Sequence, residues 1–256
     1  MLTGWVSRPA SGGTAKLPAI FLIHGGSSLS SEDERFGPRK LLESKAITTH
    51  LAKKYVIFSV EYKSRYFADD LEFESIKAAY KVFKKLPDVD KNRIAVMGIS
   101  HGGFLALLAV LNPDLDIKAK AVVSVCGVVD LAMHVRYYEE LVKKDKFAQY
   151  DSYGVSGVKN RLGWPPDKSK QAKTAYQNRS ALTYAKNLNI PLLLVHGKAD
   201  KFVPFEQTER LAVELDKYGK SYELHAVPGF FRGHHFLIFS RGKVKDWVAD
   251  FLAKNL

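Results

Sequence analysis

The chain has 256 residues, of which 46% are hydrophobic, and it carries a formal net charge of +12 and one cysteine. One cysteine excludes an internal disulfide and a multi-cysteine metal cage. An apolar run of about eighteen residues, which would span a membrane, does not occur, and the amino terminus lacks a signal-peptide pattern, so we expect a cytoplasmic protein.

Short apolar runs alternate with longer helical patterns along the chain. This alternation predicts an α/β fold with a mostly parallel central sheet that has helices on both faces. After a short amino-terminal strand, we expect strands at 18–26, 55–63, 93–100, 119–127 and 190–197, and a more exposed last strand at 221–229. Helical spacing predicts helices at 70–86, 103–112, 204–220 and 243–256.

The interval 131–189 is too long for one crossover between strands and carries turn signals. We therefore expect one domain, with a core formed by 1–130 and 190–256 and a helical lid inserted at 131–189. Residues 131–190 contain eleven Lys and Arg against five Asp and Glu, and this excess of six positive charges is half of the net charge. The same residues include many aromatic side chains. Because no recognised nucleic-acid motif accompanies them, we expect a basic face over an apolar pocket and no nucleic-acid partner.

The segment Gly98-Ile99-Ser100-His101-Gly102 lies between an apolar strand and an apolar helix. A strand that turns sharply into a helix strains the backbone of its central residue, and side chains two positions away would collide unless they were glycine. Ser100 is then exposed at the carboxyl edge of the sheet. The pattern predicts a nucleophilic serine, and the backbone N–H of His101 can face a developing oxyanion.

A serine hydroxyl needs a base and a carboxylate to react at neutral pH. Most of the eight histidines end strands or fall in predicted helices, the lid or the last strand, which leaves His234 and His235 in the loop after that strand. We favour His234 as the base because a glycine precedes it, and His235 is the alternative. Asp200 follows an apolar strand and is the predicted acid; a turn or capping aspartate is the structural alternative.

The turn after the first central strand contains Gly25 and Gly26, which permit close approach of a substrate. We expect the N–H of Gly26 to be the second oxyanion donor, with Ser27 in reserve; a plain glycine turn is the alternative. We expect no cofactor and no metal. Cys126 is interpreted as a small buried residue at a strand end.

These motifs together resemble the α/β-hydrolase superfamily, and within it prolyl oligopeptidase-like and dienelactone hydrolase-like esterases. "DVDKNRIAVMGISHGG" is similar to the nucleophile segment of the family, "NIPLLLVHGKADKFVP" to its acid segment and "GHHF" to its Gly-His-x-Phe ending. The resemblance implies an α/β-hydrolase fold with Ser100 as nucleophile, Asp200 as acid and His234 as base. Extra residues before His234 depart from the family loop, and the lid matches nothing that can be carried over.

The expected activity is that of a serine carboxylesterase on a small-molecule ester, with an acyl-enzyme intermediate. The aromatic lid favours apolar or aryl acyl groups, such as a hydroxycinnamate of the feruloyl type, and its basic residues favour negatively charged substrates. An aminoacyl-peptidase with the same residues is the first alternative. A non-catalytic binding protein on the same scaffold is the second.

Overall fold

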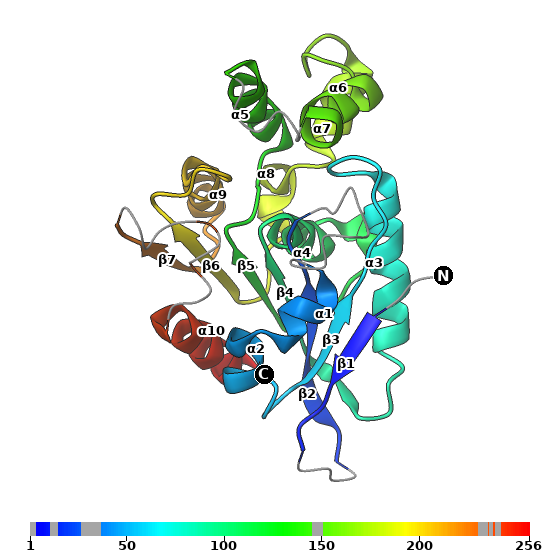
Figure 1. Cartoon of the computed structure of the whole chain (residues 1–256), viewed down its shortest axis with the longest axis vertical. Coiled ribbons are helices and arrows are strands. Elements are labelled where there is room, and N and C mark those ends of the chain that lie inside the picture. Colours follow the sequence, from blue (N-terminus) through cyan, green and yellow to red (C-terminus); the bar gives the residue numbers. More distant parts are fainter. Residues whose placement is uncertain are drawn as a thin grey trace.

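The computed structural model describes residues 4–10, 15–26, 37–144, 151–229, 235, 238 and 242–256. Its centre is a seven-stranded sheet in the order β1-β3-β2-β4-β5-β6-β7 (Figure 1). The strands are β1 (Gly4–Ser7), β2 (Leu17–Ile23), β3 (Val56–Val60), β4 (Val89–Ile99), β5 (Ala121–Val125), β6 (Leu192–Gly197) and β7 (Glu223–Val227). Only β1 is antiparallel to its neighbour, so the prediction of a mostly parallel sheet is confirmed.

Helices cover both faces of this sheet. They are α1 (Pro38–Glu43), α2 (Lys45–His50), α3 (Asp70–Phe83), α4 (His101–Leu111), α5 (Leu131–Lys143), α6 (Ser156–Leu162), α7 (Lys170–Gln177), α8 (Ala181–Tyr184), α9 (Glu206–Lys217) and α10 (Gly242–Asn255). In the described part of the chain, no helix is long and apolar enough to cross a membrane.

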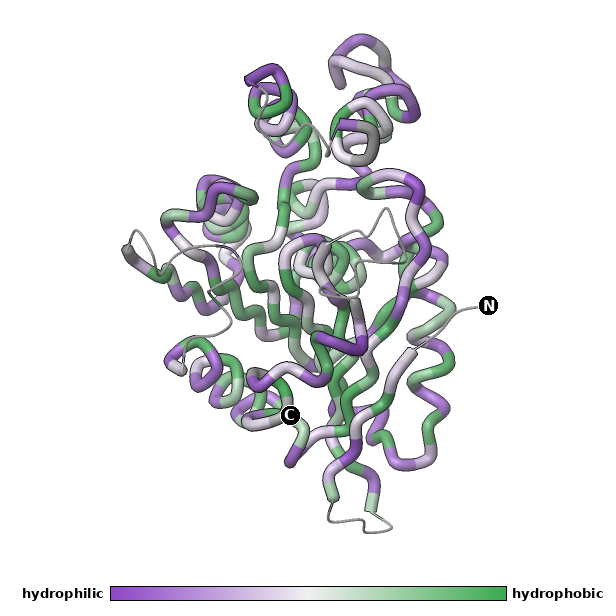
Figure 2. The backbone as a smooth tube through the Cα atoms, viewed as in Figure 1, coloured by the Kyte–Doolittle hydropathy of each residue, from purple (hydrophilic) through white to green (hydrophobic). Residues whose placement is uncertain are grey.

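Alternate strand residues point into two separate cores. Phe21 and Val96 pack with α3 and α4 on one face, whereas Leu22 and Met97 pack with α2 and α10 on the other. Both sides of every central strand are therefore buried, which explains why these strands read as continuous apolar runs. Figure 2 shows this hydrophobic concentration along the central strands.

Several element boundaries differ from the prediction, and two of the differences have a clear structural cause. Strand β4 begins at Val89, because Val89 pairs with Leu17 before a register shift brings Ala19 opposite Ile94. Helix α9 begins at Glu206, and the preceding proline stands just outside it, where its carbonyl accepts a hydrogen bond from the N–H of Gln207.

The interval between β5 and β6 is helical. It contains α5, a π-helical turn (Asp151–Val155), α6, α7, α8 and a 3₁₀ turn (Ala185–Asn187). Helices α5, α6 and α7 lie together at one end of the molecule (Figure 1). A function of this segment as a lid stays a prediction.

Candidate active site

Ser100 occupies a strained turn between β4 and α4, which we call the elbow. Its backbone angles are φ 57° and ψ −121°, outside the regions that L-residues prefer. A Cβ atom added to Gly98 would lie 1.9 Å from the carbonyl oxygen of Gly102, and one added to Gly102 would lie 2.1 Å from that of Ile23. Both glycines are thus required by close backbone contact, as the sequence predicted.

The side chain that lies between Ser100 and Asp200 is that of His235. Its Nδ1 atom lies 2.6 Å from Oδ2 of Asp200, and its Nε2 atom lies 2.7 Å from Oγ of Ser100. Because a carboxylate only accepts hydrogen bonds, Nδ1 carries a hydrogen and donates a hydrogen bond to Asp200. The lone pair of Nε2 then faces Ser100, so the serine hydroxyl donates to it. This arrangement can accept the serine proton as the hydroxyl attacks a carbonyl carbon.

The histidine at this position is the alternative of the sequence analysis. The sequence analysis favoured His234, which lies outside the described residues, and kept His235 as the alternative. The two histidines are adjacent, and the loop that carries them has no periodic pattern that could say which side chain turns toward the sheet edge. The tertiary structure brings His235 to both Ser100 and Asp200.

Asp200 lies in the turn after β6, as predicted, and its carboxylate is almost fully enclosed. Its Oδ1 atom accepts hydrogen bonds from the N–H groups of Phe202 and Val203, at 2.8 and 2.9 Å. Burial opposes ionisation of this carboxyl, but hydrogen bonds from His196 and His235 outweigh it and hold the pKa of Asp200 well below its usual range. Asp200 is therefore a fixed negative charge behind the imidazole.

His196 holds this turn from the end of β6. Its Nε2 atom lies 2.9 Å from the carbonyl oxygen of Val203, and its Nδ1 atom lies 2.6 Å from Oγ1 of Thr208. A carbonyl only accepts, so Nε2 donates to Val203 and Nδ1 accepts from the Thr208 hydroxyl. The same Nε2 atom is 3.4 Å from Oδ2 of Asp200, so the ring also faces the carboxylate.

The residues of the two predicted oxyanion donors lie near Ser100. His101 begins α4, and an N–H in the first turn of a helix has no acceptor within that helix. Gly26 has φ 71° and ends a turn that lies against the elbow, because a Cβ atom added to Gly25 would be 2.9 Å from Cβ of Ser100. The reserve donor, Ser27, lies outside the described residues.

Other buried side chains surround the three residues. Burial lowers the pKa of His24 to about 4 and the pKa of His134 to about 3, so both rings are neutral near pH 7. The thiol of Cys126 is completely buried beside Asp200; burial first, and the neighbouring carboxylate second, raise the pKa of this thiol well above its usual value. Cys126 is thus the small buried residue that the sequence predicted.

The sulfur of Cys126 and ligand atoms of Asp200 and His235 lie within 4.8 Å of one another. Such a group could in principle hold a metal ion. However, the imidazole and the carboxylate already bind each other through a proton, and the thiol remains protonated. The donor set fits a proton-transfer site better than a metal centre.

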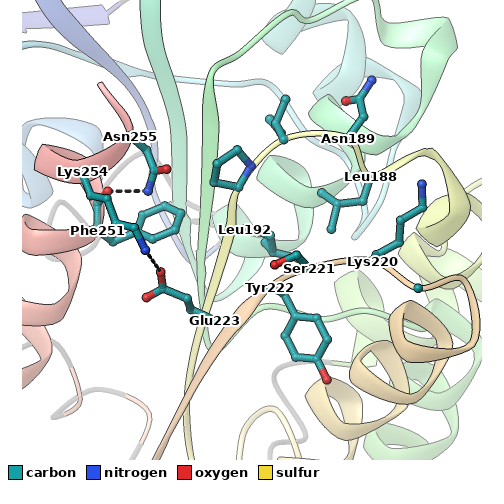
Figure 3. Close-up of a pocket in the computed structure, with 13 residues that line it drawn as sticks. Leu188, Asn189, Leu192, Lys220, Ser221, Tyr222, Glu223, Phe251, Lys254 and Asn255 are labelled. Atoms are coloured by element: carbon teal, nitrogen blue, oxygen red, sulfur yellow. Dashed lines mark hydrogen bonds and ion pairs between the residues drawn. The ribbon is translucent and has the colours of Figure 1, made fainter.

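A cavity of about 430 Å³ lies away from these residues. It is formed by the start of β6, the segment before β7 and the end of α10, as Figure 3 shows. Inside it, Lys254 pairs with Glu223 at 3.3 Å, and Asn255 donates to the carbonyl of Phe251. Because β6 runs from this cavity toward Asp200, the cavity lies at the opposite edge of the sheet from Ser100.

Sequence and structure comparisons give the relatives of this chain. It is 26% identical over 239 residues to "Uncharacterized peptidase YuxL" of Bacillus subtilis, which covers 89% of the chain and 33% of that protein. It is 25% identical over 256 residues to a "Probable dipeptidyl-aminopeptidase B" of Arthroderma gypseum, covering 93% of the chain and 24% of that protein. The chain thus spans about a third or less of the length of these relatives.

Solved structures share the fold. The acylaminoacyl peptidase of Pyrococcus horikoshii superposes with a TM-score of 0.72 at 23% identity, covering 100% of this chain and 40% of that one. A thermophilic esterase of Thermogutta terrifontis superposes with a TM-score of 0.69 at 20% identity, covering 99% of this chain and 89% of that one. These likenesses show an α/β-hydrolase fold. The model of the prolyl oligopeptidase family matches residues 65–256, and the chain belongs to that family.

Proposed function

We propose that the protein is a serine hydrolase that cleaves carboxylic esters through an acyl-enzyme. The observation that carries this proposal is the position of His235, which is hydrogen-bonded to Ser100 on one side and to Asp200 on the other. The order Ser100, Asp200, His235 along the chain is also that of α/β-hydrolases.

In the first half of the reaction, Nε2 of His235 takes the proton of Ser100 while Oγ forms a bond to the ester carbonyl carbon. The negative charge of Asp200 stabilises the imidazolium that results. The backbone N–H groups of Gly26 and His101 donate to the oxyanion. The C–O bond to the leaving alcohol then breaks, and His235 returns its proton to that oxygen.

In the second half, water attacks the acyl carbon of the acyl-enzyme. His235 takes one proton of this water and passes it to Oγ of Ser100 as the acyl bond breaks, which releases the carboxylic acid. The residues return to their starting protonation states, and the cycle requires no further group.

Aromatic rings near the three residues support an apolar or aryl acyl group. The ring of Phe202 lies 5.5 Å from that of His235. Helix α5 contributes His134, whose ring lies 4.6 Å from Phe67 and 4.8 Å from Tyr138. Such surroundings suit an apolar or hydroxycinnamoyl-type acid better than a strongly polar one.

Some basic side chains of the interval 131–189 contact other residues of the same interval. Arg136 and Lys159 lie 5.7 and 5.5 Å from the ring centre of Trp164, and Lys159 also pairs with Glu139 at 2.7 Å. These contacts support a folded helical segment in which Arg136 and Lys159 have partners of their own. A small ester, rather than a nucleic acid, is the proposed substrate.

An aminoacyl-peptidase is the second candidate. The names of the two relatives, a peptidase and a dipeptidyl-aminopeptidase, favour it. The same serine, histidine and aspartate would act on an amide, where His235 must protonate a poorer leaving group.

Parallel assays with p-nitrophenyl butyrate, p-nitrophenyl ferulate and aminoacyl p-nitroanilides separate the candidates. We expect a higher kcat/KM for the esters, and a clear preference for the anilides would overturn the esterase proposal. A fluorophosphonate probe should label the protein but not the Ser100→Ala variant. No labelling of the wild-type protein would favour a non-catalytic binding protein, and labelling of the variant would refute Ser100 as the nucleophile.

A further inference from the structure

A second buried pair of histidine and carboxylate lies next to the nucleophile. His101 follows Ser100 directly, and its Nε2 atom lies 2.9 Å from Oε2 of Glu72 on helix α3. The side chain of His101 is 3% exposed and that of Glu72 is 0% exposed. The proposed reaction uses only the backbone N–H of His101, so it gives this buried pair no task.

The hydrogen bonds of Glu72 fix the orientation of the His101 ring. A carboxylate only accepts hydrogen bonds, so Nε2 of His101 carries a hydrogen and donates a hydrogen bond to Oε2. The other oxygen, Oε1, accepts from the hydroxyl of Ser64. One face of the ring stacks on Phe67, with centroids 4.1 Å apart. These contacts leave the ring little freedom to turn.

The opposite nitrogen of His101 faces the hydroxyl of Tyr62, with 3.4 Å between Nδ1 and Oη. The same hydroxyl lies 3.2 Å from the carbonyl oxygens of both His24 and Gly26. A phenol has one proton, so Oη donates either to one of these carbonyls or to the lone pair of Nδ1, and all three acceptors lie within its reach. The ring of Tyr62 also stacks on that of His24, at 4.5 Å and 16°.

These contacts join the two donors of the oxyanion hole. One donor is the N–H of His101, whose own side chain is held by Glu72. The other is the N–H of Gly26, in the turn whose carbonyls Tyr62 contacts. Because an oxyanion needs both donors within about 3 Å, their separation must be held to a fraction of an ångström.

We infer that Glu72, His101 and Tyr62 form a positioning relay that sets the distance between the two oxyanion donors. This inference rests on the proposed function. The two ring nitrogens of His101 are directed at Glu72 and Tyr62, and Ser100 has His235 as its partner. The three side chains of the relay are positioning residues, and they act on the transition state through the backbone.

The first variant is Tyr62→Phe, which keeps the stacked ring and removes only the hydroxyl. We expect kcat for p-nitrophenyl butyrate to fall about tenfold, less than the loss of a whole oxyanion donor, and KM to stay within about twofold. The affinity for a trifluoromethyl ketone, which forms an oxyanion on Ser100, should weaken by the same factor as kcat. Inhibition by butyrate, which forms no tetrahedral adduct, should not change.

Tyr80→Phe is the matched control. Tyr80 is also buried, and its hydroxyl also donates to a backbone carbonyl, that of Lys118. Its ring contacts in the described part of the chain are with Phe21, Phe83 and Lys84, outside the relay. Its kcat and ketone affinity should equal those of the wild-type protein even if the melting temperature falls. Glu72→Gln is a second test, which keeps the size of the side chain and removes its charge; kcat and ketone affinity should again fall together.

The outcomes distinguish the relay from the proposed function. If the wild-type protein hydrolyses the ester and both Tyr62→Phe and Glu72→Gln keep kcat and ketone affinity within about twofold, the relay is wrong and the hydrolase proposal stands. An equal loss in Tyr80→Phe would also overturn the relay. If the wild-type protein neither hydrolyses the ester nor reacts with the fluorophosphonate probe, both proposals fail together.

Discussion

The Nε2 atom of His235 lies 2.7 Å from Oγ of Ser100, although the two residues are 135 positions apart in the chain. The His235→Ala variant should therefore lose a factor of about 10³ or more in kcat for p-nitrophenyl butyrate, because the serine loses its base. Steady-state kinetics of the purified variant measure this loss.

His234→Ala is the natural comparison, because it removes the neighbouring imidazole and leaves the bonds of His235 in place. We expect it to retain kcat within about tenfold, since it does not remove the base. If His234→Ala were inactive while His235→Ala kept its activity, the assignment of the base to His235 would be wrong.

Gly98 cannot accept a side chain. A Cβ atom there would lie 1.9 Å from the carbonyl oxygen of Gly102, so the elbow would have to open. Gly98→Ala should lower the free energy of unfolding by about 3 kcal/mol or more and abolish activity. Gly242→Ala is the control, since its added Cβ meets no atom of the described residues within 4 Å outside its chain neighbours and its own helix backbone. Urea denaturation of both variants checks the difference, and equal stabilities would contradict it.

Acid should destabilise the fold below pH 6.5 through buried histidines. Burial depresses the folded-state pKa of His24 to about 4 and that of His134 to about 3, from 6.5. The unfolded chain therefore binds protons that the folded one does not, and stability is lost as the pH falls from 6.5 toward these values. Each ring contributes a loss of about 2 kcal/mol between pH 7.5 and pH 5.

His134→Phe should reduce this pH dependence, because it removes one of the two groups. Tyr138→Phe alters a neighbour of His134 without removing a histidine, so it should keep the wild-type dependence. Asp200 does not contribute in this window, because its pKa is lowered from 3.8 and its effect on stability appears only at more acidic pH. Urea titrations at pH 7.5 and pH 5 test the prediction, and a dependence unchanged by His134→Phe would refute it.

The thiol of Cys126 should be inert in the folded protein. It is completely buried, and its raised pKa leaves little of the reactive thiolate at pH 8. Iodoacetamide at pH 8 should leave the native chain unmodified over an hour, whereas the chain in concentrated guanidinium chloride should take up one carbamidomethyl group. Mass spectrometry measures both, and rapid modification of the native chain would show that the site opens.

The sheet strands, the turn at Ser100 and the turn that carries Asp200 were predictable from local sequence. Continuous apolar runs are the signature of strands buried on both faces. Steric exclusion around Ser100 requires glycines at 98 and 102, and these glycines can be read from the sequence. Asp200 was predictable because a turn just after a parallel strand lies at the carboxyl edge of the sheet.

Local sequence could not show which histidine lies against Ser100, and the folded chain places His235 there. His234 and His235 are neighbours with the same chemistry. A shift of the loop by one residue would bring the other imidazole to the same place. The pair of Glu72 and His101 was also missed, although it left a trace in the sequence. Glu72 lies on the same helical face as Ile76, Ala79 and Phe83, so a carboxylate stands where an apolar residue is expected. Its partner, His101, lies on another helix. A buried charge is stabilised by such long-range contacts, and the local sequence pattern does not specify them.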